Sequence, residues 1–168
     1  AAVCCGVIYE MKLTDIAKYL KDYKLPSNRV GILKGKKSTI VINDVYNANP
    51  ESMMAGVDTL CELKKNIKGK KRKVAVLGDM FELGEKSFEL HMLVGEYIEK
   101  KVDISVLVGK NMQDVYNMLR ADYEGIYWYP DSETASKEIG KIIQENDIIL
   151  VKGSRGMKME KVVESLKL

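Results

Sequence analysis

Short apolar runs alternate along the chain with longer segments whose apolar residues recur every three or four positions. The apolar runs cover residues 38–43, 73–78, 104–109, 125–129 and 147–152. The helical segments cover residues 53–61, 90–98, 112–119, 135–142 and 159–166. Strands that are each followed by a helix predict parallel pairing through right-handed crossovers. Because the runs are continuously apolar, we expect an α/β fold whose mostly parallel sheet carries helices on both faces.

The first 37 residues show a different pattern. Residues 1–11 are typical of the middle of a buried helix of small residues, and Thr14 is expected to cap a second helix that Pro26 ends. Since no Met precedes Ala1, we expect a fragment of a longer protein. The chain is therefore predicted to have a short helical segment and connector at 1–37, followed by one domain at 38–168.

The segment GILKGKKS (31–38) resembles a phosphate-binding loop but does not match one. Only three residues separate Gly31 from Gly35, whereas the phosphate loop GxxxxGK[ST] requires four, and the segment precedes a strand instead of following it. A hairpin turn is predicted here.

Composition excludes a disordered tail or a fibre. The 168 residues are 46% hydrophobic and 30% charged, which is enough apolar material for the core of one domain. The net charge of +3 comes from the run 64–73, in which seven of ten residues are Lys or Arg. That run contains no aromatic residue, so it indicates a solvated helix–strand connection and not a nucleic-acid site.

Cysteine and histidine are too sparse for a metal centre. Cys4, Cys5 and Cys61 lack both the spacing of zinc ligands and that of a disulfide framework, and His91 is the single histidine. Reduced thiols suit a cytoplasmic protein. No apolar stretch approaches the roughly 20 residues of a membrane span, and no secretion signal is visible, so neither export nor membrane insertion is expected.

Ligands of open parallel sheets bind beyond the carboxyl ends of the strands, so the loops there are the candidate site. The loop DVYNANP follows the first run and offers the carboxylate of Asp44, the phenol of Tyr46 and the amides of Asn47 and Asn49. These groups could hold a ribose and a base. Alternatively, Asn49 simply caps a helix that has Pro50 in its first turn.

A second polar loop, KGSRGMK, follows the last apolar run. It contains Lys152, Gly153, Ser154 and Arg155, and a helix is expected to start near Ser154. Free backbone N–H groups and two cations would form an anion site there. In the alternative interpretation the glycines only permit a turn and the cations are solvated.

The third loop, GDMFELGE, places Asp79 where it could hold an ammonium group or a metal-bound water. His91 follows Ser87 by four residues on one helical face. A structural role, in which the ring bonds a neighbouring loop, is favoured over a general base because no suitable partner is spaced nearby.

Three motifs, DVYNANP, LGDMFELGEKSFELH and VKGSRGMKMEKVVE, follow one another in this order. Together they resemble the C-terminal part of the Mur ligases of peptidoglycan synthesis. Other members carry His-containing versions such as DYAHTP at the first motif, so YNANP favours the branch that adds a dipeptide. The resemblance implies a Rossmann-like C-terminal domain at 38–168, with 1–37 forming the tail of the central ATP-binding domain and a connector.

The same resemblance implies an ATP-dependent amide ligation. ATP phosphorylates the terminal carboxylate of UDP-N-acetylmuramoyl-tripeptide, and the amine of D-Ala-D-Ala attacks the acyl phosphate. ATP and Mg²⁺ would be bound mainly by the central domain, so no catalytic residue is assigned to this fragment and it is expected to be inactive alone. The expected protein is a monomer that binds these small molecules and neither nucleic acid nor membrane.

By the same resemblance Arg29 reaches the ATP phosphates, although Asn28 stands where the family often has Gly before this Arg. The expected nucleotide-side residues are Asp44, Tyr46, Asn47 and Asn49. The expected dipeptide-side residues are Asp79, Lys152, Gly153, Ser154 and Arg155. Their charge suggests that Lys152 or Arg155 pairs with the dipeptide carboxylate. His91 is expected to support these residues without contacting the ligand.

Two alternatives from other classes are weighed against this interpretation. A signalling receiver domain would fit Asn43, Asp44 and Lys152, but the third run ends in Val108 and Gly109 and has no phosphoacceptor Asp. A stand-alone nucleotide-binding or interaction module would use the sheet edge or the basic run.

Overall fold

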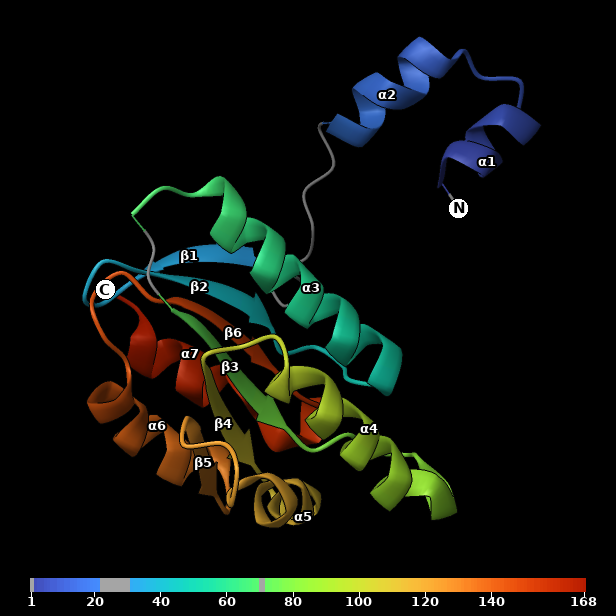
Figure 1. The fold of residues 1–168 in the computed structure, drawn as a ribbon. Helices are drawn as coiled ribbons and strands as arrows, with labels where there is room; N and C mark the ends of the chain where they lie inside the picture. Colours follow the sequence, from blue (N-terminus) through green and yellow to red (C-terminus); the bar gives the residue numbers. More distant parts are fainter. Residues whose placement is uncertain (1, 22–30, 70–71) are drawn as a thin grey trace.

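The computed structural model describes residues 2–21, 31–69 and 72–168, and Figure 1 draws the helices and strands in chain order. The described helices are α1 Ala2–Ile8, α2 Leu13–Lys21, α3 Pro50–Asn66, α4 Ser87–Glu99, α5 Lys110–Leu119, α6 Ser132–Ile142 and α7 Glu160–Leu166. The described strands are β1 Gly31–Gly35, β2 Thr39–Asp44, β3 Lys73–Gly78, β4 Ile104–Val108, β5 Ile126–Tyr129 and β6 Ile148–Lys152.

Within these described residues the strands form one sheet in the order β1-β2-β6-β3-β4-β5. β2, β6, β3, β4 and β5 pair in parallel, and β1 pairs antiparallel with β2. The expectation of a mostly parallel α/β sheet is confirmed, and the five apolar runs all became strands.

β1 is the strand that the apolar runs did not include. Its apolar residues are Ile32 and Leu33 between two glycines, and Ile32 is 63% exposed at the sheet edge. The hairpin predicted for 31–38 is present, since Gly35 pairs with Thr39 across the turn. The sheet thus begins at Gly31, before the expected boundary after residue 37, and the domain division itself stays a prediction.

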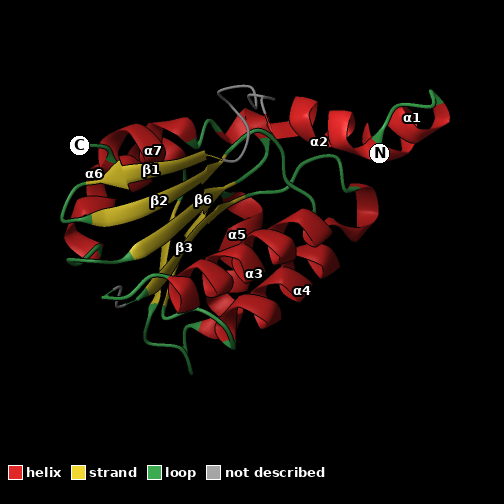
Figure 2. Cartoon of the chain, turned by 90° about the horizontal axis from the view of Figure 1, so that it is seen from above, coloured by secondary structure: helices red, strands yellow, loops and turns green. Residues whose placement is uncertain are grey.

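Helices cover both faces of the sheet, as the continuous apolar runs predicted (Figure 2). Successive strand residues point to opposite faces, so Ala75 and Leu77 pack with α3, α4 and α5, whereas Val74 and Val76 pack with α6 and α7. Each fully buried Val or Leu side chain among these contributes about 1.5–3 kcal/mol relative to an exposed one. The loops at the strand ends are therefore held on a sheet with two apolar cores.

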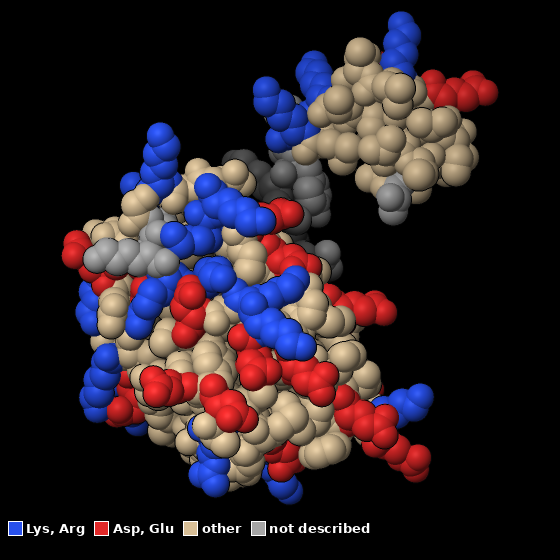
Figure 3. All heavy atoms as spheres, viewed as in Figure 1, with Lys and Arg blue, Asp and Glu red and all other residues tan. Residues whose placement is uncertain are grey.

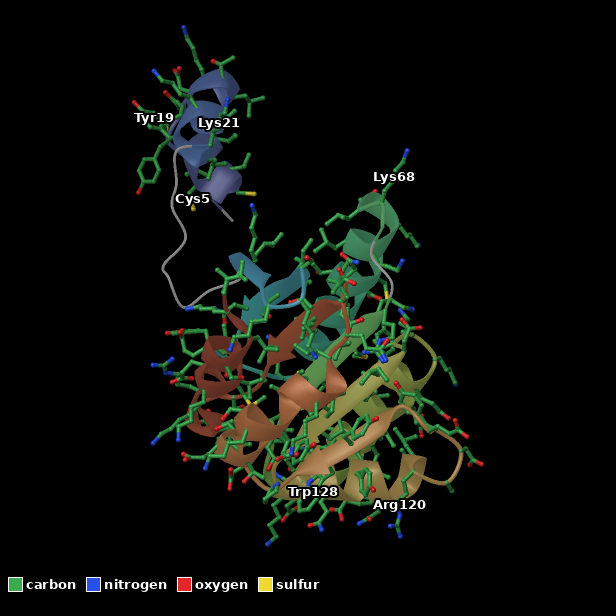
Figure 4. The ribbon with its side chains drawn as sticks, turned by 90° about the vertical axis from the view of Figure 1, so that its left-hand side faces the viewer. Cys5, Tyr19, Lys21, Lys68, Arg120 and Trp128 are labelled. Atoms are coloured by element: carbon green, nitrogen blue, oxygen red, sulfur yellow. The ribbon has the colours of Figure 1, made fainter. Side chains whose placement is uncertain are left out.

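The N-terminal helices α1 and α2 pack on each other and are drawn apart from the sheet in Figure 1. Ile16 is buried against Gly6, whereas Tyr19 of α2, labelled in Figure 4, is exposed. Two expectations were wrong: α2 begins at Leu13, so Thr14 lies inside the helix and does not cap it, and most of α1 is exposed. The expected helix end at Pro26 lies outside the described residues.

The basic run begins at the C-terminal end of α3. On the face drawn in Figure 3, basic side chains gather near this helix end with acidic side chains beside them. Lys101, on the neighbouring α4–β4 connection, pairs with Asp58 at 2.6 Å. A cation at a helix C-terminus is favoured by the helix dipole, which gives Lys64 and Lys65 an ordinary structural setting. None of the helices in the described part of the chain combines the length and apolar character of a membrane span.

Candidate ligand site at the carboxyl edge of the sheet

The three polar loops follow three strands that lie side by side. β6 lies between β2 and β3, so the loops that begin after Asp44, Lys152 and Gly78 emerge together at one edge of the sheet (Figure 1). We call this edge, with the loops at 44–50, 78–86 and 152–158, the carboxyl edge. The sequence separates these loops by tens of residues, and the strand order brings them together.

Lys152 joins the loop after β6 to the loop after β2. Its Nζ lies 2.7 Å from Oδ2 of Asp44 and donates a second hydrogen bond of 2.8 Å to the carbonyl oxygen of Asn47. The Lys152 side chain is only 3% exposed. Its charge is therefore neutralised within the chain, whereas Arg155 is exposed. Of the two cations proposed to pair a ligand carboxylate, Arg155 is the accessible one.

The helix expected near Ser154 starts later than predicted. Residues Arg155–Met157 form a 3₁₀ turn, and α7 begins only at Glu160. Ser154 instead binds the neighbouring loop: its N–H donates to the carbonyl oxygen of Asp79 at 3.0 Å, and its Oγ accepts from the N–H of Phe81 at 2.8 Å. The anion site expected at a helix N-terminus beside Ser154 is therefore not formed by these residues.

Asp79 caps α5 from a distance in sequence. Its Oδ1 accepts from the N–H of Met112 at 2.8 Å and its Oδ2 from the N–H of Asn111 at 3.1 Å. Gly109 occupies the N-cap position of α5 and has no side chain to do this, so the carboxylate from the next strand substitutes. Asp79 is 4% exposed and both of its carboxylate oxygens are engaged in this cap, so its role is structural. It also lines the pocket described below.

His91 bonds the neighbouring loop, as the structural interpretation expected. Its Nε2 accepts from the N–H of Met80 at 3.0 Å, and the ring is buried. A ring engaged in this way supports the loop that carries Asp79 and does not face the pocket.

The loop after β2 combines a helix cap with two exposed polar side chains. Oδ1 of Asn49 accepts from the N–H of Ser52 at 2.8 Å, and Oγ of Ser52 accepts from the N–H of Asn49 at 3.1 Å. This capping box is the alternative that the sequence left open for Asn49. Tyr46 and Asn47 are exposed. Arg29, expected at the ATP phosphates, lies outside the described residues.

A pocket of about 510 Å³ lies among the loops after β3, β4, β5 and β6. Its lining includes Asp79, Gly109, Lys110, Asp131, Lys158 and Lys161. Lys110 is the first residue of α5 and Lys158 closes the 3₁₀ turn after β6. Neither was predicted as a site residue from the sequence. These lysines give the pocket a cationic side that suits an anionic ligand.

Local hydrogen bonds lower the pKa of two carboxyl groups of the pocket, those of Asp131 and Glu133. The N–H of Thr134 lowers the pKa of Asp131, which caps α6. Hydrogen bonding to Lys161 lowers the pKa of Glu133, and the same contact raises the pKa of Lys161. Because this lysine already has a carboxylate partner, Lys110 and Lys158 are the better candidates for binding an anion.

No group of three or more His, Cys, Asp or Glu side chains in residues 2–21, 31–69 and 72–168 is arranged to hold a metal ion. Lys68 and Arg120, labelled in Figure 4, follow the C-terminal ends of α3 and α5 and lie at the opposite end of the sheet from the carboxyl edge. Substitutions of these two residues can therefore serve as controls for substitutions within the candidate site.

Known proteins are similar to this chain in both sequence and fold. Residues 28–155 match the family described as "Mur ligase, glutamate ligase domain". The chain is 31% identical over 169 residues to the UDP-N-acetylmuramoyl-tripeptide–D-alanyl-D-alanine ligase of Bacillus subtilis (strain 168). This match covers 99% of this chain and 36% of that relative. The chain thus spans about a third of the length of such relatives.

Solved structures agree with the sequence match. A crystal structure of MurF from Acinetobacter baumannii superposes with a TM-score of 0.81 at 27% identity, covering 98% of this chain and 35% of that one. The MurF ligase from Thermotoga maritima, solved in complex with ADP, gives a TM-score of 0.73 at 25% identity over 97% of this chain and 35% of that one. The family match covers most of the chain, and the chain therefore belongs to the Mur ligase family, within its glutamate ligase domain.

Proposed function

We propose that this chain is the C-terminal part of an ATP-dependent ligase that adds D-Ala-D-Ala to UDP-N-acetylmuramoyl-tripeptide. The observation that carries the proposal is the 31% identity along 99% of the chain to a ligase of that name. The grouping of all three motif loops at the carboxyl edge supports it, since ligands of parallel α/β sheets bind there. In this proposal residues outside the chain complete the active site, and the chain alone is inactive.

The nucleotide side of the proposed site is the loop after β2. Tyr46 and Asn47 are exposed there, and a relative of the same fold was solved with ADP. Asp44 and Asn49 contribute differently, because the Asp44 carboxylate pairs with Lys152 and the Asn49 oxygen caps α3. We therefore assign contact with ATP to Tyr46 and Asn47 and the shape of the loop to Asp44 and Asn49, with Arg29 retained as a phosphate contact by resemblance.

The dipeptide side is the pocket and the 3₁₀ turn beside it. D-Ala-D-Ala carries one carboxylate, and the exposed guanidinium of Arg155 together with Lys110 and Lys158 supplies cations at this end of the sheet. An arginine can bind a carboxylate with two parallel hydrogen bonds, which fixes direction as well as charge. The loop that presents Arg155 is held by Lys152, Gly153 and Ser154. Asp79 holds the N-terminus of α5, where Lys110 lies.

The chemical step forms one amide bond and consumes one ATP. The γ-phosphoryl group of ATP is transferred to the tripeptide carboxylate, the dipeptide amine then attacks that carbonyl carbon, and phosphate leaves while the amine loses a proton. The residues of this chain bind and orient the amine and exclude water; they do not form the acyl phosphate. Such positioning alone can contribute many orders of magnitude in rate.

Magnesium is part of the proposal through the resemblance, and the described residues do not fit it. They contain no cluster of carboxylate, imidazole or thiolate ligands, so the Mg²⁺ ligands of the ligase are assigned to residues outside them. No step is assigned to the ion within this chain.

The test uses the full-length ligase that contains this chain. We expect D-Ala-D-Ala-dependent release of phosphate from ATP in the presence of the tripeptide precursor. Arg155→Ala should raise the KM for D-Ala-D-Ala about tenfold or more, as expected for a lost charge-assisted pair. Arg120→Ala removes another exposed arginine, at the opposite end of the sheet, and should leave that KM unchanged. Absence of dipeptide-dependent turnover by the unmodified ligase would refute the proposed function.

A further inference from the structure

The peptide group that joins Asp79 to Met80 is hydrogen-bonded at both ends. Its carbonyl oxygen accepts from the N–H of Ser154 at 3.0 Å, and its N–H donates to Nε2 of His91 at 3.0 Å. Ser154 belongs to the loop after β6, and His91 belongs to α4. One peptide group thus joins the loop after β6 to α4.

The geometry sets the protonation state of His91. Its Nδ1 lies 2.7 Å from the carbonyl oxygen of Ser87, and because a carbonyl oxygen only accepts, Nδ1 carries a proton. Nε2 faces the N–H of Met80, so it must be unprotonated. The ring is therefore neutral, with its proton on Nδ1. It is 1% exposed, so water does not substitute for either partner.

The residues that precede and follow Met80 are also hydrogen-bonded to parts of the candidate site. The Asp79 carboxylate caps α5 beside the pocket, and the N–H of Phe81 donates to Oγ of Ser154 at 2.8 Å. Met80 itself is 1% exposed. If His91 lost its acceptor, the buried N–H of Met80 would be left without a partner, and rotation of the peptide plane toward another acceptor would take the Asp79 carbonyl away from Ser154.

We propose that His91 is a positioning residue for the incoming dipeptide, acting through the peptide group between Asp79 and Met80 to hold the loop of Ser154 and Arg155 in place. The inference rests on the proposed function, because it assigns Arg155 to the dipeptide. It assigns no proton transfer to His91. The ring acts as a hydrogen-bond acceptor that fixes the peptide group between Asp79 and Met80, and through this group the loop that contains Ser154.

Two amide variants of the full-length ligase separate the acceptor from simple packing. In His91→Gln the side-chain oxygen reaches the place of Nε2 and can accept from Met80. In His91→Asn the shorter amide reaches only the place of Nδ1, so it serves Ser87 and leaves Met80 unpaired. The two side chains have the same chemistry and differ by one methylene group.

We expect His91→Asn to raise the KM for D-Ala-D-Ala about tenfold with the KM for ATP unchanged, and His91→Gln to stay within about threefold of the unmodified ligase for both. Equal effects of the two variants, or an equal rise in both KM values, would overturn the inference, because either result indicates general loss of stability. If the unmodified ligase shows no dipeptide-dependent turnover, the proposed function itself fails, and the inference fails with it.

A spectroscopic measurement on the unmodified ligase does not depend on whether the variants fold. The ¹⁵N signals of the His91 ring at neutral pH should show the neutral form protonated on Nδ1, and the Met80 amide should be protected from hydrogen exchange. A ring protonated on Nε2, or a charged ring, would overturn the inference, since neither can accept from Met80.

Discussion

Asp44 and Lys152 are direct partners in the register of β2 and β6, and their side chains form an ion pair of 2.7 Å in which the lysine is buried and the carboxylate partly buried. The pair stands where both strands end, so it fixes the starting points of two loops of the proposed site. Lys152 also donates to the carbonyl oxygen of Asn47, which extends the link into the first loop. A residue whose charge suggested ligand binding is thus part of the framework.

Lys152→Met should destabilise the chain by about 3 kcal/mol, because removal of one partner leaves a partly buried carboxylate without its counter-charge. Asp44 is 19% exposed, so water compensates only in part. Urea unfolding followed by circular dichroism measures the loss. As a control, Lys141→Met breaks an ion pair with Glu138 whose lysine is 74% exposed, and it should unfold like the unmodified chain. Equal losses in both variants would contradict the framework role.

Asn49→Ala should lower the free energy of unfolding by about 1 kcal/mol, the usual contribution of an N-cap side chain. The oxygen that accepts from Ser52 would be lost and the first turn of α3 left uncapped. Asn49→Ser keeps a capping oxygen and should retain most of the stability in thermal unfolding. In the full-length ligase, Asn49→Ser should also leave ADP affinity unchanged. A lower affinity with the cap intact would instead assign the Asn49 amide to the nucleotide.

The strands could be predicted from the sequence because both of their faces are buried, which leaves apolar runs that no other element explains. β1 escaped this criterion. It lies at the sheet edge, pairs on one side only, and offers just Ile32 and Leu33 between glycines. Its presence was visible only indirectly, through the predicted hairpin turn that leads into β2.

The strand order, which brings the loops of the site together, could not be predicted from local sequence patterns. Local spacing placed Asp44, Asp79 and Lys152 correctly at strand ends, but it did not show that β6 lies between β2 and β3. That order decides that Lys152 meets Asp44. Likewise, Asp79 caps α5 because β3 and β4 are neighbours, and no spacing within one segment shows a cap that comes from 32 residues away.

Gly109→Ala should destabilise the chain by about 1–3 kcal/mol. Gly109 has φ of +115°, and an added Cβ would lie 2.5 Å from the Asp79 carboxylate that caps α5. Both the backbone and the cap would be strained. Gly140→Ala provides the matched control, because a Cβ there meets nothing within 4 Å inside α6, and it should stabilise the chain by about 0.5–1 kcal/mol. Urea unfolding of the two variants should therefore shift in opposite directions, and a loss at both positions would contradict the argument.

Asp131 should make stability depend on pH in the acidic range. The hydrogen bond from the N–H of Thr134 lowers the pKa of this carboxyl below its ordinary value of 3.8, so the folded state favours the ionised form. The stabilisation is present above the ordinary pKa and is lost as the pH falls through the lower folded value.

Asp131→Asn keeps a capping oxygen but cannot titrate, whereas Asp131→Ala removes the cap at every pH. In urea unfolding, the advantage of the unmodified chain over Asp131→Asn should be present near neutral pH and disappear as the pH falls through the lowered pKa of the folded state. Its advantage over Asp131→Ala should shrink over the same range, because the protonated carboxyl is a weaker acceptor for the N–H of Thr134. A difference from Asp131→Asn that stays constant with pH would show that the charge of Asp131 does not contribute to the N-terminus of α6.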